Sequence, residues 1–133
     1  MNLVLDTSAG IEVALGRAKA KPIVSLLNDA EWVIAPELYM MEAANTFWKL
    51  GRLSEVTLDR CEKGLELTIS MIDDFFGSRD LFRESFSLAC LANHPVYDML
   101  YFVLARRHNA QLVTLDKKLS SIAVKHGVKV ADV

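Results

Sequence analysis

The sequence predicts an α/β fold, a three-layer α/β/α sandwich with a central parallel sheet. Short apolar runs typical of buried strands alternate with longer segments in which apolar residues recur at helical spacing. The connections are short and no repeat or low-complexity stretch interrupts the order, which favours a parallel sheet covered on both faces. The 133 residues are expected to form a single domain, residues 1–133, because two domains of half that length would each lack a sizeable core.

The expected strands are apolar segments that end at polar or turn-forming residues. The first is Asn2-Leu3-Val4-Leu5, which stops at Asp6-Thr7-Ser8 and leads into a capped helix. The remaining strands are predicted at 32–35, 71–75, 111–114 and 128–130. The last of these follows Gly127 and is expected to be an edge strand.

The expected helices are bounded by capping residues, prolines and glycines. Pro22 lies in the first turn of one helix and Pro36 opens another, because the first turn has no intrahelical N–H bond for proline to remove. Gly51 follows the end of the helix that Pro36 opens, and Ser54 is predicted to cap the next one. The predicted helices span 9–15, 22–27, 36–50, 54–69, 81–91, 96–108 and 117–126.

Composition excludes several classes of protein. With 52% hydrophobic residues and a net charge of −2, the chain is too apolar and too weakly charged to be disordered. No apolar run approaches the roughly 20 residues of a membrane span, and Met1 to Asp6 lacks the basic start of a signal peptide. Cys61 and Cys90 have no CxxC spacing and are expected to be small core residues in a reducing compartment. We therefore expect a soluble, cytoplasmic protein with no membrane partner.

Four acidic residues are candidates for one site, because the carboxyl ends of parallel strands meet at the same edge of a sheet. Asp6 directly follows the first strand, and Asp116 follows the strand that ends at Thr114 after one further residue. Asp98 lies in the first turn of the helix that precedes that strand, and Glu42 lies inside the helix that follows the second strand.

Each acid also has an ordinary structural explanation. Asp6, Asp98 and Asp116 stand at helix starts, where an aspartate caps backbone N–H groups and meets the positive end of the helix dipole. A surface position is a weaker explanation for Glu42, because the helix around it is apolar on nearly every side. Glu42 and Asn45 are three residues apart, so they share a face and are expected to need a common polar partner.

Acids gathered in one place indicate a particular chemistry. They repel one another and have raised pKa values unless a cation compensates them. Oxygen ligands without histidine or cysteine suit Mg²⁺ or Mn²⁺ better than Zn²⁺. Such an ion activates a water and orients a phosphodiester, so the pattern favours phosphate chemistry.

Four sequence fragments, taken in order, resemble the PIN domain family and more narrowly the VapC-type toxin ribonucleases. The resemblance spans nearly the whole chain, although the region between about Arg52 and His94 carries no signature. The fragments are Val4-Leu5-Asp6-Thr7-Ser8, Glu42-Ala43-Ala44-Asn45, Tyr97-Asp98-Met99-Leu100-Tyr101-Phe102-Val103-Leu104-Ala105 and Leu112-Val113-Thr114-Leu115-Asp116.

The resemblance implies an endoribonuclease that uses Mg²⁺ or Mn²⁺ and a metal-activated water. It implies that Asp6 and Asp98 are the principal metal ligands and that Glu42 completes the first site or holds a metal-bound water. Asp116 would serve a second metal or its water shell. It further implies a small antitoxin that inserts a segment near the acidic pocket, and a homodimer. The supporting polar residues would be Thr7, Ser8, Asn45 and Thr114.

The net negative charge of the chain is not what an RNA-binding protein usually has. Positive side chains close to the site could compensate for it. From Tyr101 onward the net charge is +4, which leaves −6 for the rest of the chain. Cations near the site would neutralise phosphates, and solvated helix ends explain the same charges equally well. The cations considered are Arg106, Arg107, Lys117 and Lys118.

Two other functions were weighed against the nuclease. A phosphatase of the haloacid-dehalogenase kind also has an aspartate after its first strand, but it needs a second aspartate where this chain has Ser8. The other is a non-catalytic metal- or RNA-binding module of the same fold. Nucleotide-binding folds with GxGxxG or P-loop motifs have no support in the sequence.

Apolar and histidine side chains outside the acidic pattern have simpler expectations. Met40, Met41, Phe47 and Trp48 are expected mostly in the core, although one face of so apolar a helix is a candidate for contact with another chain. His94 lies four residues before Asp98, where it is a candidate to reach a substrate phosphate or is a loop residue without a task.

Overall fold

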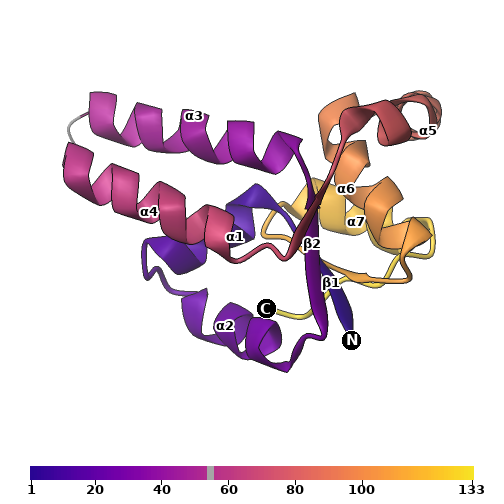
Figure 1. Ribbon diagram of the computed structural model, residues 1–133. Helices are drawn as coiled ribbons and strands as arrows, with labels where there is room; N and C mark the ends of the chain where they lie inside the picture. The colour runs from indigo at the N-terminus through magenta and orange to yellow at the C-terminus, as the bar shows by residue number, and fades with distance from the viewer. Residues whose placement is uncertain (54–55) are drawn as a thin grey trace.

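The computed structural model describes residues 1–53 and 56–133, and it has the predicted three-layer α/β/α architecture (Figure 1). The described residues form a four-stranded parallel sheet in the order β3-β2-β1-β4. In chain order the elements are β1 (Asn2–Leu5), α1 (Thr7–Ala14), α2 (Ala20–Asp29), β2 (Trp32–Pro36), α3 (Leu38–Arg52), α4 (Leu58–Ser70), β3 (Asp74–Phe76), α5 (Ser78–Ala92), α6 (Val96–Arg107), β4 (Gln111–Val113) and α7 (Lys117–Lys125).

The sheet separates two groups of helices. Figure 1 shows α1, α2, α3 and α4 on one side of the strands and α5, α6 and α7 on the other. The central strand β1 pairs with β2 on one side, Val4 opposite Ile34, and with β4 on the other, Val4 opposite Leu112. All pairings are parallel, so the strands point their carboxyl ends to the same edge.

Helices α6 and α3 are both strongly apolar, but only α6 is enclosed. Residues 99–105 of α6 are buried without interruption, which agrees with an apolar sequence on every side of the helix. Helix α3 packs beside α4, and the pair projects beyond the sheet in Figure 1. Met41 and Trp48 are 69% and 58% exposed, so the prediction that they lie in the core is wrong.

Several predicted helix ends are also wrong. Pro36 lies at the end of β2 and does not open α3, which begins at Leu38. Helix α3 continues through Gly51, where an added Cβ would make ordinary contact with the Cys61 sulfur, at 3.4 Å. Helix α4 begins at Leu58 with Thr57 as its N-cap. The predicted cap Ser54 lies outside the described residues.

The predicted strand 128–130 is reduced to one bridge, between Val130 and Leu112. Two backbone bonds of 2.9 Å hold it, from the Leu112 N–H to the Lys129 carbonyl and from the Ala131 N–H to the Leu112 carbonyl. Strand β3 spans 74–76, so it shares only residues 74–75 with the predicted strand 71–75. Cys61 is buried as expected, whereas Cys90 is exposed, contrary to the prediction.

The length and hydropathy of the helices bear on membrane crossing. In the two described segments, no single helix is long and apolar enough to span a bilayer. Helices α5 and α6 pass the same length and composition test only when they are taken together, across a bend of 112°.

Candidate active site at the carboxyl ends of β1 and β4

Asp6 is buried at the end of the central strand, and both of its carboxylate oxygens accept hydrogen bonds. Oδ1 accepts from the Ser8 hydroxyl at 2.6 Å and from the backbone N–H of Ala9 at 3.1 Å, so Asp6 is the N-cap of α1. Oδ2 accepts from the hydroxyl of Thr114, at the end of β4. The Asp6 side chain therefore joins β1, the first turn of α1 and the segment after β4.

Thr114 and Ser8 connect Asp6 to the segment that carries Asp116. The Thr114 oxygen accepts from the Asp116 N–H at 3.0 Å, and the Ser8 oxygen accepts from the Leu115 N–H at 3.1 Å. The Asp116 carboxylate itself caps α7, since its Oδ1 accepts from the Lys118 and Leu119 N–H groups at 2.9 and 3.2 Å. The capping explanation is thus observed for Asp116.

Glu42 projects from α3 toward α6 and α1. Its Oε1 accepts from the Tyr101 hydroxyl at 2.5 Å and from the Thr7 hydroxyl at 3.2 Å. The two hydroxyl oxygens are 2.9 Å apart, so they form one polar cluster inside an apolar surrounding. The sequence predicted that Glu42 and Asn45 share a polar partner. Glu42 does have polar partners, but Asn45 does not share them, because it is exposed on α3.

Asp98 lies one turn before Tyr101 on α6 and is partly buried. Its Oδ2 is 2.7 Å from Nε2 of His94, at the residue four positions earlier. His94 is only 10% exposed, so it is neither a loop residue without a task nor a side chain open to substrate. It holds one oxygen of the Asp98 carboxylate.

The carboxylates at this edge of the sheet act on one another through their charges. Burial raises the pKa of Asp6 to about 6, against the hydrogen bonds that lower it, and the charge of Glu42 raises it further. Burial also raises the pKa of Glu42, the hydrogen bonds from Tyr101 and Thr7 oppose that shift, and the charge of Asp98 adds to it. The charge of Glu42 thus acts on Asp6, and the charge of Asp98 acts on Glu42.

The surroundings supply little compensating positive charge. Among the described residues, neither Asp6 nor Glu42 forms an ion pair with a lysine or arginine. A cavity of about 450 Å³ is lined by Thr7, Ser8, Glu42 and, as its cation, Arg17. A second cavity, of about 720 Å³, is lined by Thr114, Asp116 and Lys117.

The cations nearest to the acids are therefore not all those that the sequence suggested. Arg106 and Arg107 lie 2.9 and 3.4 Å from the carboxylate of Glu84 on α5, so their charges are already paired. Lys117 lines the same cavity as Asp116, and Arg17, from the segment after α1, lines the same cavity as Glu42. The pairing with Glu84 depends on how α5 packs on α6, which no local pattern reveals.

The donor chemistry of Asp6, Glu42 and Asp98 fits a hard divalent cation. All three offer carboxylate oxygens, the charge of Glu42 raises the pKa of Asp6, the charge of Asp98 raises the pKa of Glu42, and Glu42 Oε2 has no hydrogen-bond partner among the described residues. Over the described ranges, however, no three His, Cys, Asp or Glu side chains stand close enough together to form a metal-binding group. The assignment of metal ligands stays a prediction.

Sequence reasoning missed the parts played by Tyr101 and His94. In the sequence, Tyr101 is one residue of an apolar helix. In the structure it is 2% exposed. Its position three residues after Asp98 places both on one face of α6, which is the signal that the sequence did contain. His94 lies in the connection between α5 and α6, four residues before Asp98, so no helical spacing in the sequence indicates this contact.

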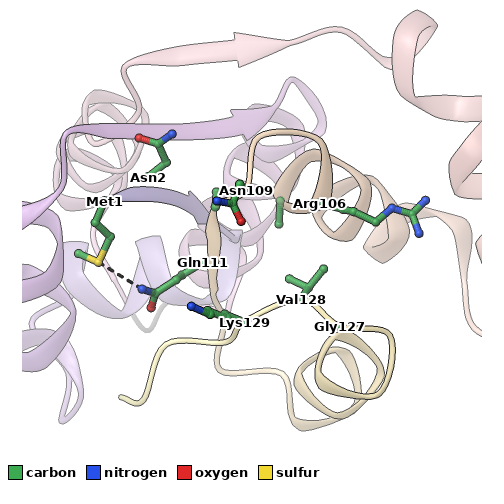
Figure 2. Close-up of a pocket in the computed structure, with 10 residues that line it drawn as sticks. Met1, Asn2, Arg106, Asn109, Gln111, Gly127, Val128 and Lys129 are labelled. Atoms are coloured by element: carbon green, nitrogen blue, oxygen red, sulfur yellow. Dashed lines mark hydrogen bonds between the residues drawn. The ribbon is translucent and has the colours of Figure 1, made fainter.

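A cavity of about 280 Å³ at the opposite end of the strands contains none of these acids (Figure 2). It lies where β1 and β4 begin and includes Met1 and Gln111, whose amide donates to the Met1 sulfur at 3.4 Å. Figure 2 shows the Arg106 side chain pointing away from Met1 and Gln111, and its guanidinium pairs with Glu84. The acidic side chains and this cavity are thus at opposite edges of the sheet.

Known proteins resemble this chain over most of its length. Ribonuclease VapC3 from Pyrobaculum aerophilum is 26% identical over 126 residues, which are 90% of this chain and 93% of that protein. The crystal structure of PAE2754 from the same organism superposes with a TM-score of 0.74 at 23% identity, over 92% of this chain and 84% of that one. The structure of VapBC2 from Rickettsia felis bound to a promoter DNA fragment gives 0.67 at 14% identity, over 98% of both chains.

The match to a family covers the sheet and the candidate site together. Residues 3–125 match the PIN domain, a range that begins in β1 and ends in α7. It contains Asp6, Glu42, Asp98 and Asp116, together with the hydroxyl groups that hold the first two. The match over this range shows that the chain belongs to the PIN domain family.

Proposed function

We propose that this protein is an endoribonuclease that depends on Mg²⁺ or Mn²⁺ and hydrolyses RNA phosphodiester bonds. The observation that carries the proposal is the buried Asp6 carboxylate beside the charge of Glu42, with no ion pair to either in the described part of the chain. Uncompensated buried carboxylates are costly, and a bound divalent cation removes that cost. Family membership and the similarity to a VapC ribonuclease support the same activity.

In this proposal the acids have different tasks. Asp6 and Asp98 would hold the metal, and Glu42 would complete its ligands or hold one of its waters. Asp116 would serve a second metal or its water shell. A bound ion would lower the pKa of a water and neutralise charge on the leaving oxygen.

The chain's own polar groups would keep the site in order. Ser8 and Thr114 fix both Asp6 oxygens, and Thr7 helps to fix Glu42. Arg17 and Lys117 line the adjacent cavities, where they would attract RNA phosphates. Asn45 is exposed on α3 and would contact the substrate rather than the metal ligands.

We also propose that the protein is the toxin of a toxin–antitoxin pair, working in the cytoplasm. A cavity of about 350 Å³ between α3 and α4 is lined largely by apolar side chains, among them Phe47, the exposed Trp48 and Leu58. An apolar antitoxin segment would cover these side chains. Co-expression with a candidate antitoxin should yield a complex that Trp48→Glu weakens, and recovery of the two proteins apart would contradict the pairing.

A homodimer is the proposed state of the free protein. Phe82 and Phe86 are 50% and 61% exposed one turn apart on α5, where a second copy of the chain would cover them. Sedimentation equilibrium should give a dimer mass at micromolar concentration. A monomer over that whole range would contradict the proposal.

Cleavage of a mixed RNA pool tests the nuclease proposal. We expect cleavage with Mg²⁺ or Mn²⁺, none with EDTA, and at least about 100-fold less from the Asp6→Asn variant. Asp29→Asn is the matched control, because it removes the same charge from an exposed position at the end of α2. Activity that survives Asp6→Asn would contradict the assignment, and binding of RNA without cleavage would favour the non-catalytic module.

A further inference from the structure

We infer that Tyr101 is a positioning residue, which fixes the Glu42 carboxylate so that its free oxygen is available to a divalent cation. The inference rests on the proposed function, because it takes the metal site at Asp6, Glu42 and Asp98 as its starting point. Tyr101 would touch neither metal nor substrate and would act through Glu42 alone.

The hydroxyl groups of Tyr101 and Thr7 donate the hydrogen bonds that hold Glu42. A tyrosine hydroxyl carries its proton at neutral pH and a carboxylate oxygen can only accept, so Tyr101 is the donor in this pair. It donates to Glu42 Oε1 at 2.5 Å. The Thr7 hydroxyl donates to the same Oε1 at 3.2 Å, and its oxygen lies 2.9 Å from the Tyr101 oxygen.

The two oxygens of Glu42 have different surroundings. Oε1 carries both hydrogen bonds, and the described residues offer Oε2 none. An unbranched glutamate side chain has three rotatable bonds and loses considerable entropy when it is held in one place. Anchoring one oxygen in a buried cluster meets that entropic cost during folding, so the other oxygen is presented in a fixed position.

Helix α6 links this anchor to another candidate ligand. Asp98 and Tyr101 are three residues apart and therefore lie on one face of the helix. The residues 99–105 are buried around them, which leaves α6 little freedom to move. One rigid helix thus carries Asp98 itself and also the hydroxyl that holds Glu42 from α3.

Tyr39 provides a matched control within the same fold. It is also a fully buried tyrosine with a raised pKa, and it also donates one hydrogen bond, at 2.8 Å. Its acceptor is the Thr68 backbone carbonyl at the end of α4, not a carboxylate. Tyr39→Phe and Tyr101→Phe each remove one buried hydroxyl, so a general loss of packing or stability would affect both variants alike.

Mn²⁺ binding to the purified, chelator-treated chain tests the inference by calorimetry, without any need for RNA cleavage. We expect Tyr101→Phe to weaken Mn²⁺ binding by about tenfold or more, the usual effect of removing a group that orients a metal ligand. Tyr39→Phe should bind within about twofold of the unaltered chain. In a Glu42→Gln background, Tyr101→Phe should have no additional effect on Mn²⁺ affinity, because the carboxylate that Tyr101 positions is already absent.

Three results would overturn the inference. They are equal Mn²⁺ affinity for Tyr101→Phe and the unaltered chain, equal losses for Tyr39→Phe and Tyr101→Phe, and an undiminished effect of Tyr101→Phe in the Glu42→Gln background. If any of these results occurs while Asp6→Asn abolishes Mn²⁺ binding and RNA cleavage, the proposed function stands without the role of Tyr101. If the unaltered chain binds no Mn²⁺, the inference and the metal site are both wrong.

Cleavage kinetics give a second readout. A positioning role predicts that Tyr101→Phe lowers kcat at limiting Mn²⁺, leaves KM for RNA unchanged and recovers at high Mn²⁺. A higher KM with unchanged kcat would contradict it, since that split would place Tyr101 in RNA binding.

Discussion

Asp6 and Asp116 are locally alike but differ in their wider surroundings. Each follows a strand, and each caps the helix that begins next. Asp6 follows the central strand β1, so it is buried and a hydroxyl from the neighbouring β4 segment reaches it. Asp116 follows the edge strand β4 and remains partly exposed, with backbone N–H groups as its carboxylate partners. The order of strands, rather than the local motif, makes the environment of Asp6 unusual.

The largest expected effect separates these two residues by activity. Asp6→Asn should lower RNA cleavage by about 100-fold or more, whereas Asp116→Asn, which retains the helix cap, should lower it by no more than about tenfold. Initial rates at saturating Mn²⁺ measure both. Equal losses would show that the buried position of Asp6 gives it no special part in catalysis.

Stability against pH should reveal the buried charge of Asp6. The pKa of Asp6 is about 6 in the folded chain, and the reference value of 3.8 stands for the unfolded chain. The folded chain therefore binds this proton more tightly than the unfolded chain does. The resulting stabilisation is present below about pH 4 and is lost as the pH rises through 6, by about 3 kcal/mol in the metal-free protein.

Denaturant unfolding in EDTA at pH 4 and pH 7 measures this loss. Asp6→Asn should lose less stability over the same range, and it should be the more stable protein at pH 7. The same pH dependence in both proteins would contradict a buried, uncompensated Asp6.

Removing the hydroxyl that connects the two strands should have a smaller effect. Thr114→Val leaves Asp6 Oδ2 without its donor and should lower the free energy of unfolding by about 2 kcal/mol. Thr46→Val is the control, because the Thr46 hydroxyl donates only to the Glu42 carbonyl within its own helix. Equal losses of stability would mean that the connection between Asp6 and Thr114 contributes nothing of its own.

The smallest expected effect concerns the cap of α7. Asp116→Ala should lower the free energy of unfolding by about 1 kcal/mol, whereas Asn caps helices about as well as Asp and should cost little. Thermal unfolding of both variants measures the difference. A large loss for Asp116→Asn would show that the Asp116 charge has a structural role beyond the cap.

The sequence predicted the sheet and the positions of the acids because both depend on local patterns. An apolar run that stops at a polar residue marks the end of a buried strand, and Asp6 and Asp116 were found in this way. Parallel pairing then brings those strand ends to one edge, as observed.

The sequence did not predict contacts between elements that are distant in the chain. The bond from Tyr101 to Glu42 joins residues 59 apart, and it depends on how α3 crosses α6. The same holds for Arg106, whose charge is paired with Glu84. Pro36 was misassigned to a helix because its place at the end of β2 depends on pairing with Phe76 of β3.

A crystal soaked in Mn²⁺ and measured for anomalous scattering tests most directly whether the buried carboxylates bind a metal. We expect a manganese peak bonded to Asp6 and within reach of Glu42 and Asp98, and no such peak in Asp6→Asn. No peak at Asp6 in millimolar Mn²⁺, or a peak bonded to Asp116 alone, would contradict the account.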